Sequence, residues 1–347
     1  MNHFINNLKV IRKLILLTIF INYSILLSSQ DLHFTNYRNI SSFFNPAYNG
    51  DFSGTYKIQA NARSQFDNTY KTAVFGVAYN LWSPLKSNRH WIGIGIDLEY
   101  DKSGDLAFGG AGGGLLLSYH IMLDKKGNSV FSIGGSYKST SVGFTEDSEA
   151  FNDAQKISSG SFNKDDYEKI DNISGFSSWD AGISFKSKLN KSNEVKLGVA
   201  MMHLNKPHFT FSKQGGQSTI GRRLNINANF KSYFNNRFSL EPSVYYSIVN
   251  DVDKQSNINL QMVGEYQIKK KGKWWLIAGL GYRTGDSFDI ITGMRSENTY
   301  ISFSFDVNVS EYAKVINRVG ALELGAYHII LVKQKIKFDP VIYCPRL

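Results

Sequence analysis

The sequence predicts an all-β protein, a transmembrane outer-membrane β-barrel of about 14 antiparallel strands. Two observations lead to this prediction. Segments in which apolar and polar residues alternate follow one another along nearly the whole chain, and a period of two is that of a β-strand, whose successive side chains point to opposite faces. The connections between these segments also alternate between short and long, as they do in barrels with short turns at one end and longer loops at the other.

The segment 91–101 shows the two faces most clearly. Its even-numbered positions are apolar: Ile92, Ile94, Ile96, Leu98 and Tyr100. Its odd-numbered positions from 93 onward are small or acidic: Gly93, Gly95, Asp97, Glu99 and Asp101. A row of carboxylates is costly in a dry core unless each one has a partner. We therefore expect the apolar face to meet lipid and the acidic face to meet water.

The same two-faced pattern gives about fourteen strands, an even number of the kind that bacterial barrels favour. We predict them at residues 54–65, 71–82, 90–101, 107–121, 129–139, 176–188, 194–204, 221–233, 238–249, 257–269, 273–284, 287–296, 299–309 and 320–331.

The lengths of the connections predict the orientation of the barrel. Counted from the first strand, the odd-numbered connections include the two longest, 141–175 and 205–220. The even-numbered connections, such as 83–89, 124–127 and 234–237, are short. Short turns face the periplasm in outer-membrane barrels, so we expect the cell outer membrane as the location, with the N- and C-termini in the periplasm.

Composition excludes a bundle of membrane helices. The hydrophobic fraction is 42%, and a spanning helix needs about 20 consecutive apolar residues. The one apolar run, 14–27, follows Lys9, Arg12 and Lys13 and precedes small residues, which is typical of a signal peptide. We assign residues 1–29 to this signal, with an N-terminal membrane anchor as the alternative.

Three further regions follow the signal. Residues 30–52 lack alternation and contain a turn-rich stretch, so we expect either a plug in the lumen or a periplasmic segment. Residues 53–331 form the barrel. Residues 332–347 extend beyond the last strand as a periplasmic C-terminal tail.

We predict no catalytic residues, no cofactor and no metal site. The seven histidines lack metal-ligand spacing, although His203 and His208 flank a loop start and form an alternative metal pair. The acidic residues of 141–175 lack the spacing of a calcium loop, which favours a solvated loop. The net charge of +10 indicates a lumen or rim that faces anionic lipid or glycan, and we expect no nucleic acid as a partner.

Aromatic residues near the predicted strand ends indicate girdles at the membrane interfaces. The tryptophans concerned are Trp82, Trp91, Trp179, Trp274 and Trp275. The alternative is that aromatic residues are simply favoured in strands.

Four short motifs resemble the PorP/SprF family of type IX secretion system membrane proteins. They are Gln30-Asp31-Leu32-His33-Phe34, Asn45-Pro46-Ala47 followed by Gly50, Asp306-Val307-Asn308-Val309-Ser310, and Cys344-Pro345-Arg346. Their order and positions span the mature chain. Leu347 departs from the aromatic residue that usually ends the family's sequences.

This resemblance implies a non-enzymatic outer-membrane component that helps to export or anchor a cell-surface adhesin, with periplasmic secretion and motility proteins as partners. The alternative function is a diffusion channel or hydrophobic-solute transporter. The candidate partner-binding residues are Asn45, Pro46, Cys344, Pro345, Arg346 and Leu347. In the tail, Pro345 restricts the backbone and Arg346 offers a fork of donors to a carboxylate. Cys344 is the single cysteine, so no disulfide can form within one chain.

Overall fold

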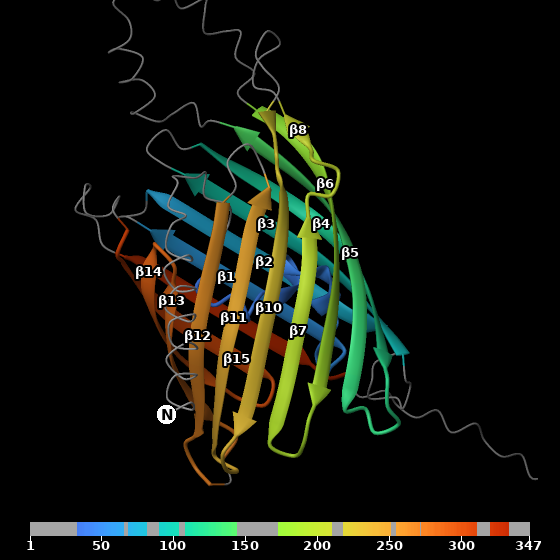
Figure 1. Cartoon of the computed structure of the whole chain (residues 1–347), viewed down its shortest axis with the longest axis vertical. Helices are drawn as coiled ribbons and strands as arrows, with labels where there is room; N and C mark the ends of the chain where they lie inside the picture. Colours follow the sequence, from blue (N-terminus) through green and yellow to red (C-terminus); the bar gives the residue numbers. More distant parts are fainter. Residues whose placement is uncertain are drawn as a thin grey trace, which may run out of the picture.

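The structure is a computed structural model that describes residues 33–65, 69–81, 90–103, 108–143, 173–209, 218–250, 255–270, 272–310 and 320–332. These residues form a closed antiparallel barrel of fourteen strands (Figure 1). Its strands are β1 (Tyr56–Gln65), β2 (Tyr70–Leu81), β3 (His90–Ser103), β4 (Phe108–Met122), β5 (Ser129–Gly143), β6 (Ile173–Lys188), β7 (Asn193–Met202), β10 (Arg222–Tyr233), β11 (Phe238–Asn250), β12 (Gln255–Gln267), β13 (Trp275–Arg283), β14 (Ser287–Arg295), β15 (Thr299–Asn308) and β16 (Ala321–Ile330).

The predicted fold class is confirmed. Each strand pairs with its neighbours in the sequence, and β1 closes the barrel on β16 with a register that runs from Tyr56↔Ile330 to Gln65↔Ala321. The largest boundary error is at the end of β5, predicted at residue 139 and observed at Gly143. A second, two-stranded sheet of β8 (His208–Phe209) and β9 (Ser218–Thr219) lies within the connection predicted at 205–220.

The two faces predicted from the alternation are present in the barrel, but the inner face of β3, which we expected to meet water, packs largely against the N-terminal segment. In β3, Ile94, Ile96, Leu98 and Tyr100 are exposed on the outside, whereas Asp97 is buried. The outer face is apolar along the other strands too, since exposed leucine, isoleucine and phenylalanine side chains recur from β2 to β16. This face matches the apolar band of a barrel that spans a membrane. None of the helices in the described part of the chain is long and apolar enough to cross a membrane.

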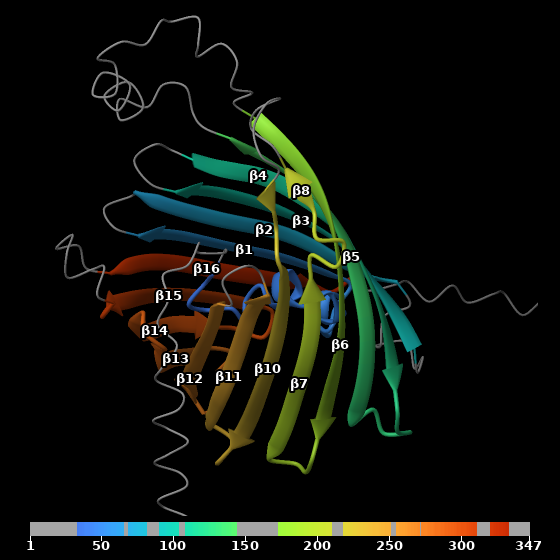
Figure 2. The same cartoon turned by 45° about the horizontal axis from the view of Figure 1, so that its top comes forward.

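The N-terminal segment lies inside the barrel. Residues 33–55, which we call the plug, include α2 (Ser41–Phe44) and η1 (Pro46–Tyr48), and Figures 1 and 2 show them in blue within the ring of strands. Asn45 is the N-cap of η1, where its side chain accepts a hydrogen bond from the Ala47 amide, and Pro46 occupies the first position of the turn. Both choices favour this local structure, because a proline at that position removes no helical hydrogen bond.

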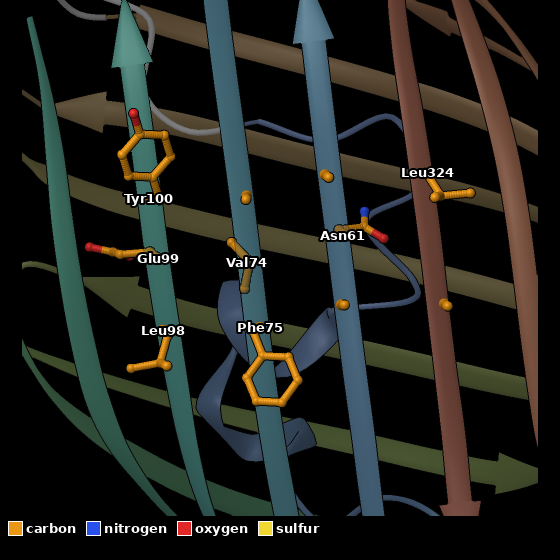
Figure 3. A pocket seen from close by; sticks show the side chains of 11 residues that line it. Asn61, Val74, Phe75, Leu98, Glu99, Tyr100 and Leu324 are labelled. Carbon is orange, nitrogen blue, oxygen red and sulfur yellow. The ribbon is translucent and has the colours of Figure 1, made fainter.

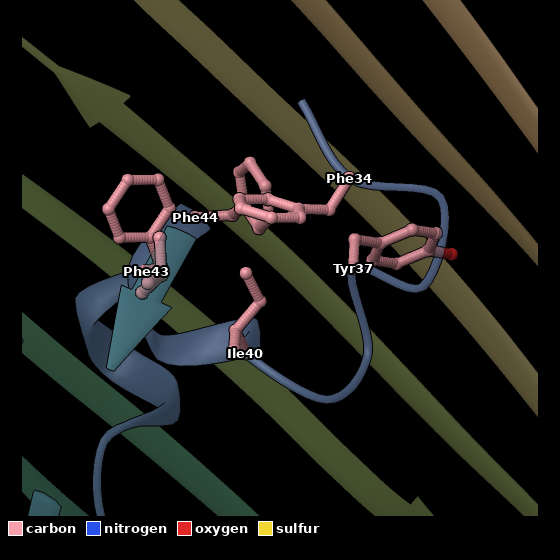
Figure 4. Close-up of a cluster of buried hydrophobic side chains, with 6 residues drawn as sticks. Phe34, Tyr37, Ile40, Phe43 and Phe44 are labelled. Carbon is pink, nitrogen blue, oxygen red and sulfur yellow. The ribbon is translucent and has the colours of Figure 1, made fainter. Parts of the chain in front are cut away.

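The plug carries its own apolar core into a polar lumen. Five buried side chains gather on one side of the segment (Figure 4): Phe34, Tyr37, Ile40, Phe43 and Phe44. The edge-to-face contact of Phe43 with Phe44, at 5.3 Å between ring centroids, is a favourable aromatic geometry. Val74 of β2 and Tyr245 of β11 complete the cluster from the barrel wall. Burial of these apolar side chains favours insertion of the segment into the lumen.

Candidate functional site

The interface between plug and barrel wall is the most elaborate polar site in the described residues. At its start, Glu323 of β16 accepts hydrogen bonds from two successive backbone amides, Thr35 N at 2.6 Å and Asn36 N at 2.8 Å. The Asn61 side chain of β1 donates a third, at 2.9 Å. One carboxylate therefore fixes the direction of the plug backbone where it first meets the wall.

Asp306 of β15 makes the second anchor at the same place. It accepts a hydrogen bond from Thr35 Oγ1 at 2.6 Å, and it pairs with Arg63 at 2.5 Å and Arg283 at 2.9 Å. The side chains of Arg63, Arg283, Asp306 and Glu323 are each at most 4% exposed. We call these four residues the sealed cluster. Buried charges are tolerated only in such pairs, so the cluster and the plug depend on each other.

The middle of the plug touches wall positions that hold glycine. A Cβ on Gly134 of β5 would lie 2.5 Å from the Pro46 carbonyl, and one on Gly93 of β3 would lie 2.6 Å from the Asn49 carbonyl oxygen. Both distances are shorter than any real Cβ contact. The wall is therefore shaped for the backbone of this segment at two separate strands.

The structure places the predicted site residues Asn45 and Pro46 at this contact. Both are buried, and the Asn45 side-chain amide donates to the carbonyl oxygens of Ile183 and Val199 at 3.1 and 3.4 Å. Asn45 and Pro46 thus join the plug to β6, β7 and β5. Their role in binding a separate protein stays a prediction.

Trp91 also contacts the plug, so its assignment to an interfacial girdle is wrong. Its side chain is buried in the lumen, and its indole N–H donates to the Gly50 carbonyl at 3.1 Å. It stacks on His120, whose Nε2 lies 2.7 Å from Asn49 O. Gly50 has a φ of +85° at this contact, a conformation that L side chains rarely adopt. Trp179 and Trp274 are exposed, as the girdle interpretation requires.

The last ionic contact of the plug before β1 is made by Asp51, which pairs with two lysines of the barrel wall. Asp51 lies 2.8 Å from the Lys186 ammonium and 2.9 Å from the Lys196 ammonium. Burial by itself would raise the pKa of Asp51, but the two ammonium groups outweigh burial and lower the pKa below its usual value of 3.8. Asp51 is therefore charged at neutral pH and holds the end of the plug electrostatically.

The other predicted sites are the C-terminal tail, the signal peptide, the acidic loop and two histidines. Cys344, Pro345, Arg346 and Leu347, the signal peptide and most of the acidic loop 141–175 lie outside the described residues. The two candidate metal-binding histidines contact different hydroxyl groups, His203 that of Ser178 and His208 that of Thr219. The described residues contain no group of three or more ligands that could hold a metal.

The sealed cluster was not predicted from the sequence, although a signal for it existed. Arg63, Asp306 and Glu323 all occupy the polar side of their strands, and each is charged among mostly neutral neighbours of that side. Such positions face the lumen of a barrel. The alternation could not predict which plug residues these charged side chains contact, because the plug has no periodic pattern.

The outer face carries an apolar groove over β16, β1, β2 and β3 (Figure 3). It has a volume of about 360 Å³. Small alanines form its floor and larger side chains such as Phe75, Leu98 and Leu324 form its walls. The groove is open to the region that lipid chains occupy, and it adds no polar chemistry to the outer face.

A comparison with protein families decides the identity of the barrel. Residues 26–327 match the family described as type IX secretion system membrane protein PorP/SprF. The chain belongs to the PorP/SprF family. The resemblance predicted from the short motifs is thereby confirmed, and this PorP/SprF protein is an outer-membrane component of type IX secretion. No curated protein matches the chain.

Solved structures show the same barrel architecture at low identity. The CymD monoaromatic hydrocarbon channel is 9% identical, with a TM-score of 0.50 over 85% of this PorP/SprF chain and 94% of that chain. The P. putida toluene transporter TodX is 9% identical, with a TM-score of 0.48 over 85% and 95% of the two chains. A Pseudomonas aeruginosa FadL homologue is 11% identical, with a TM-score of 0.48 over 84% and 94%. The first of these likenesses supports the fold alone.

Proposed function

We propose that this PorP/SprF protein is a non-enzymatic part of the type IX secretion and gliding machinery that helps to export or anchor a cell-surface adhesin. The observation that carries the proposal is the occupied lumen. A channel needs an open path, whereas here an apolar cluster, the sealed cluster and the glycine contacts fix the plug to five or more strands of the wall. A rigid barrel whose lumen is blocked by a plug suits a protein that holds other proteins at the membrane.

We further propose that the short turns lie in the periplasm. The start of β1 and the end of β16 lie together at the short-turn end, where Thr55 N donates to Ile330 O. This would place the C-terminal tail in the periplasm. The described part of the plug begins near the other end, because His33 lies 3.9 Å from Asp286 in the β13–β14 turn. A periplasmic N-terminus stays a prediction.

The rival function is a diffusion channel or hydrophobic-solute transporter, because the CymD monoaromatic hydrocarbon channel has a similar barrel fold. Two measurements on the same protein separate the proposals: single-channel conductance of the purified protein in planar bilayers, and affinity purification from native outer membranes. We expect little conductance and the recovery of a secreted surface protein. Robust conductance without any co-purifying surface protein would favour the channel.

The tail offers a second arm of the same experiment. Deletion of residues 344–347 should leave barrel assembly intact, since β16 ends at Ile330. If Pro345 and Arg346 form a periplasmic docking element, the truncated protein should retain its partners less well than the full chain in the affinity purification. Equal retention would show that the last four residues have no docking role.

A further inference from the structure

The short-turn end of the barrel is strongly basic. The described residues of its turns hold seven basic side chains and two acidic ones. They are Lys125, Lys126, Lys191, Arg237, Lys269, Lys270 and Lys273, against Asp124 and Glu297. We call these residues the rim. Charge of one sign around an opening attracts partners of the opposite sign and raises their association rate.

The part of the lumen next to the rim also has more basic than acidic side chains. Here five cations share three carboxylates: Lys186 and Lys196 with Asp51, Arg38 and Lys231 with Glu241, and Lys231 and Arg295 with Glu265. We call these eight residues the vestibule. Nearby Lys188 and Glu194 face each other in register and offset one another. The vestibule therefore keeps an excess of two positive charges.

Unlike the sealed cluster, the vestibule is partly exposed to solvent. The side chains of its eight residues are between 10% and 32% exposed, whereas those of the sealed cluster are at most 4% exposed. The difference follows from position. Lys186, Lys231 and Glu265 each lie two residues before the short-turn end of their strands, and Arg295 is the last residue of β14. At the short-turn end the plug covers the side of the lumen next to Trp91 and His120, and it leaves the side of the vestibule partly exposed.

A cavity of about 170 Å³ opens beside these charges, between the plug and β7, β10 and β11. Three of its lining residues belong to the vestibule: Arg38, Lys196 and Glu241. The rest are mostly aromatic or amide side chains, including Tyr37, Tyr48, Tyr245, Asn227 and Asn229. Since one water takes about 30 Å³ of liquid, the cavity can hold several waters or one side chain of a partner.

We propose that the vestibule binds an acidic peptide segment of a partner protein, which enters through the rim at the short-turn end. Carboxylates of the segment would pair with the excess cations, and one apolar or aromatic side chain would fill the cavity beside Tyr48 and Tyr245. Anionic lipid headgroups could reach the rim but not the lumen, where Lys196 lies 3.8 Å over the Tyr48 ring and Arg295 lies 4.2 Å over the Trp275 ring. A peptide chain can reach both.

The test uses the full chain in nanodiscs of phosphatidylcholine and a fluorescent polyglutamate peptide as the probe, with anisotropy as the readout. The double variant Lys231→Gln with Arg295→Gln should weaken binding on the order of tenfold, because it removes two paired donors from the vestibule. Lys231→Arg keeps the charge and should bind as the wild type does. Lys71→Gln, an exposed lysine at the opposite end of the barrel, is the matched control and should change nothing.

The rim is tested separately. Lys269→Gln with Lys270→Gln should slow association and reduce its salt dependence while leaving dissociation nearly unchanged, as expected for exposed charges. Equal loss in the vestibule variant and the Lys71→Gln control would overturn the proposal. So would binding that depends on the rim alone, which is the result expected of a surface for lipid headgroups.

This inference is independent of the adhesin role. Peptide binding to the purified protein needs no secretion partner, and only the periplasmic location of the partner rests on the proposed orientation. A protein that binds polyglutamate through the vestibule but recovers no surface protein from native membranes would retain the inference and lose the proposed function.

Discussion

Asp306 joins the plug to both guanidinium groups of the sealed cluster. It accepts a hydrogen bond from Thr35 of the plug and pairs with two guanidinium groups from different strands. Glu323 is 3.6 Å from Arg63 and gives that arginine a second, longer contact. Arg283 also contacts Asp286 at 3.1 Å. Replacement of Asp306 would remove the nearest carboxylate of Arg63 and would leave Arg283 with Asp286 and with Asp289 at 3.6 Å, in a site that excludes water.

Asp306→Asn should destabilise the barrel by about 3–5 kcal/mol, the usual cost of removing one partner of a buried ion pair. The measurement is urea unfolding in detergent, followed by the circular dichroism of the strands. Asp124→Asn is the control, since the half-buried Asp124 accepts a hydrogen bond from Ser129 N that asparagine can also accept. An effect of Asp306→Asn no larger than that of the control would contradict the role of the sealed cluster.

Gly134 carries the second prediction at this scale. Alanine there would place a Cβ 2.5 Å from the Pro46 carbonyl, and overpacking of this kind costs about 1–3 kcal/mol. Because the wall is held by strand pairing, we expect the plug to shift, with increased proteolysis of the plug. Gly135→Ala is the matched control, because the nearest atom to its Cβ is Asp180 O at 3.4 Å. Equal proteolysis of the two variants would show that the contact does not hold the plug.

At the scale of elements, the strands follow from the sequence and the plug does not. Every barrel strand has one face toward lipid and the other toward the lumen. Its apolar and polar residues therefore alternate with a period of two, which identifies the strand in the sequence. The plug has no such period, and its partners are remote: Thr35 and Glu323 are 288 positions apart. Trp91 could have been assigned correctly, because it shares the odd parity of Gly93 and Asp97 on the lumen side of β3.

The plug's last contact gives a prediction with a defined pH dependence. The folded pKa of Asp51 lies below its unfolded value of 3.8, so its stabilising effect is present above pH 3.8 and is lost as the pH falls below that value. The difference in unfolding free energy between the wild type and Asp51→Asn should be constant from pH 5 to pH 8 and shrink below pH 3.8. Urea unfolding across this range provides the measurement. A difference that shrinks near pH 6 would show that another group controls the contact.

At the scale of the whole molecule, the barrel is asymmetric along its axis. One end has long connections and a sealed lumen, and the other has short basic turns and a partly exposed vestibule. The N-terminal segment links the two ends, since His33 lies near Asp286 while Asp51 lies between Lys186 and Lys196. Such an asymmetry has functional meaning only if the protein has one fixed orientation in the membrane.

Cysteine labelling tests this orientation in living cells. Both variants are made in a Cys344→Ser background. Lys191→Cys places a thiol in a short turn, and Thr219→Cys places one in the connection between β7 and β10. Both positions are exposed. With a maleimide that cannot cross the outer membrane, we expect Thr219→Cys to react in intact cells and Lys191→Cys to react only after the outer membrane is permeabilised. The reverse pattern would put the basic rim and the vestibule on the cell surface, where an acidic partner would have to be extracellular.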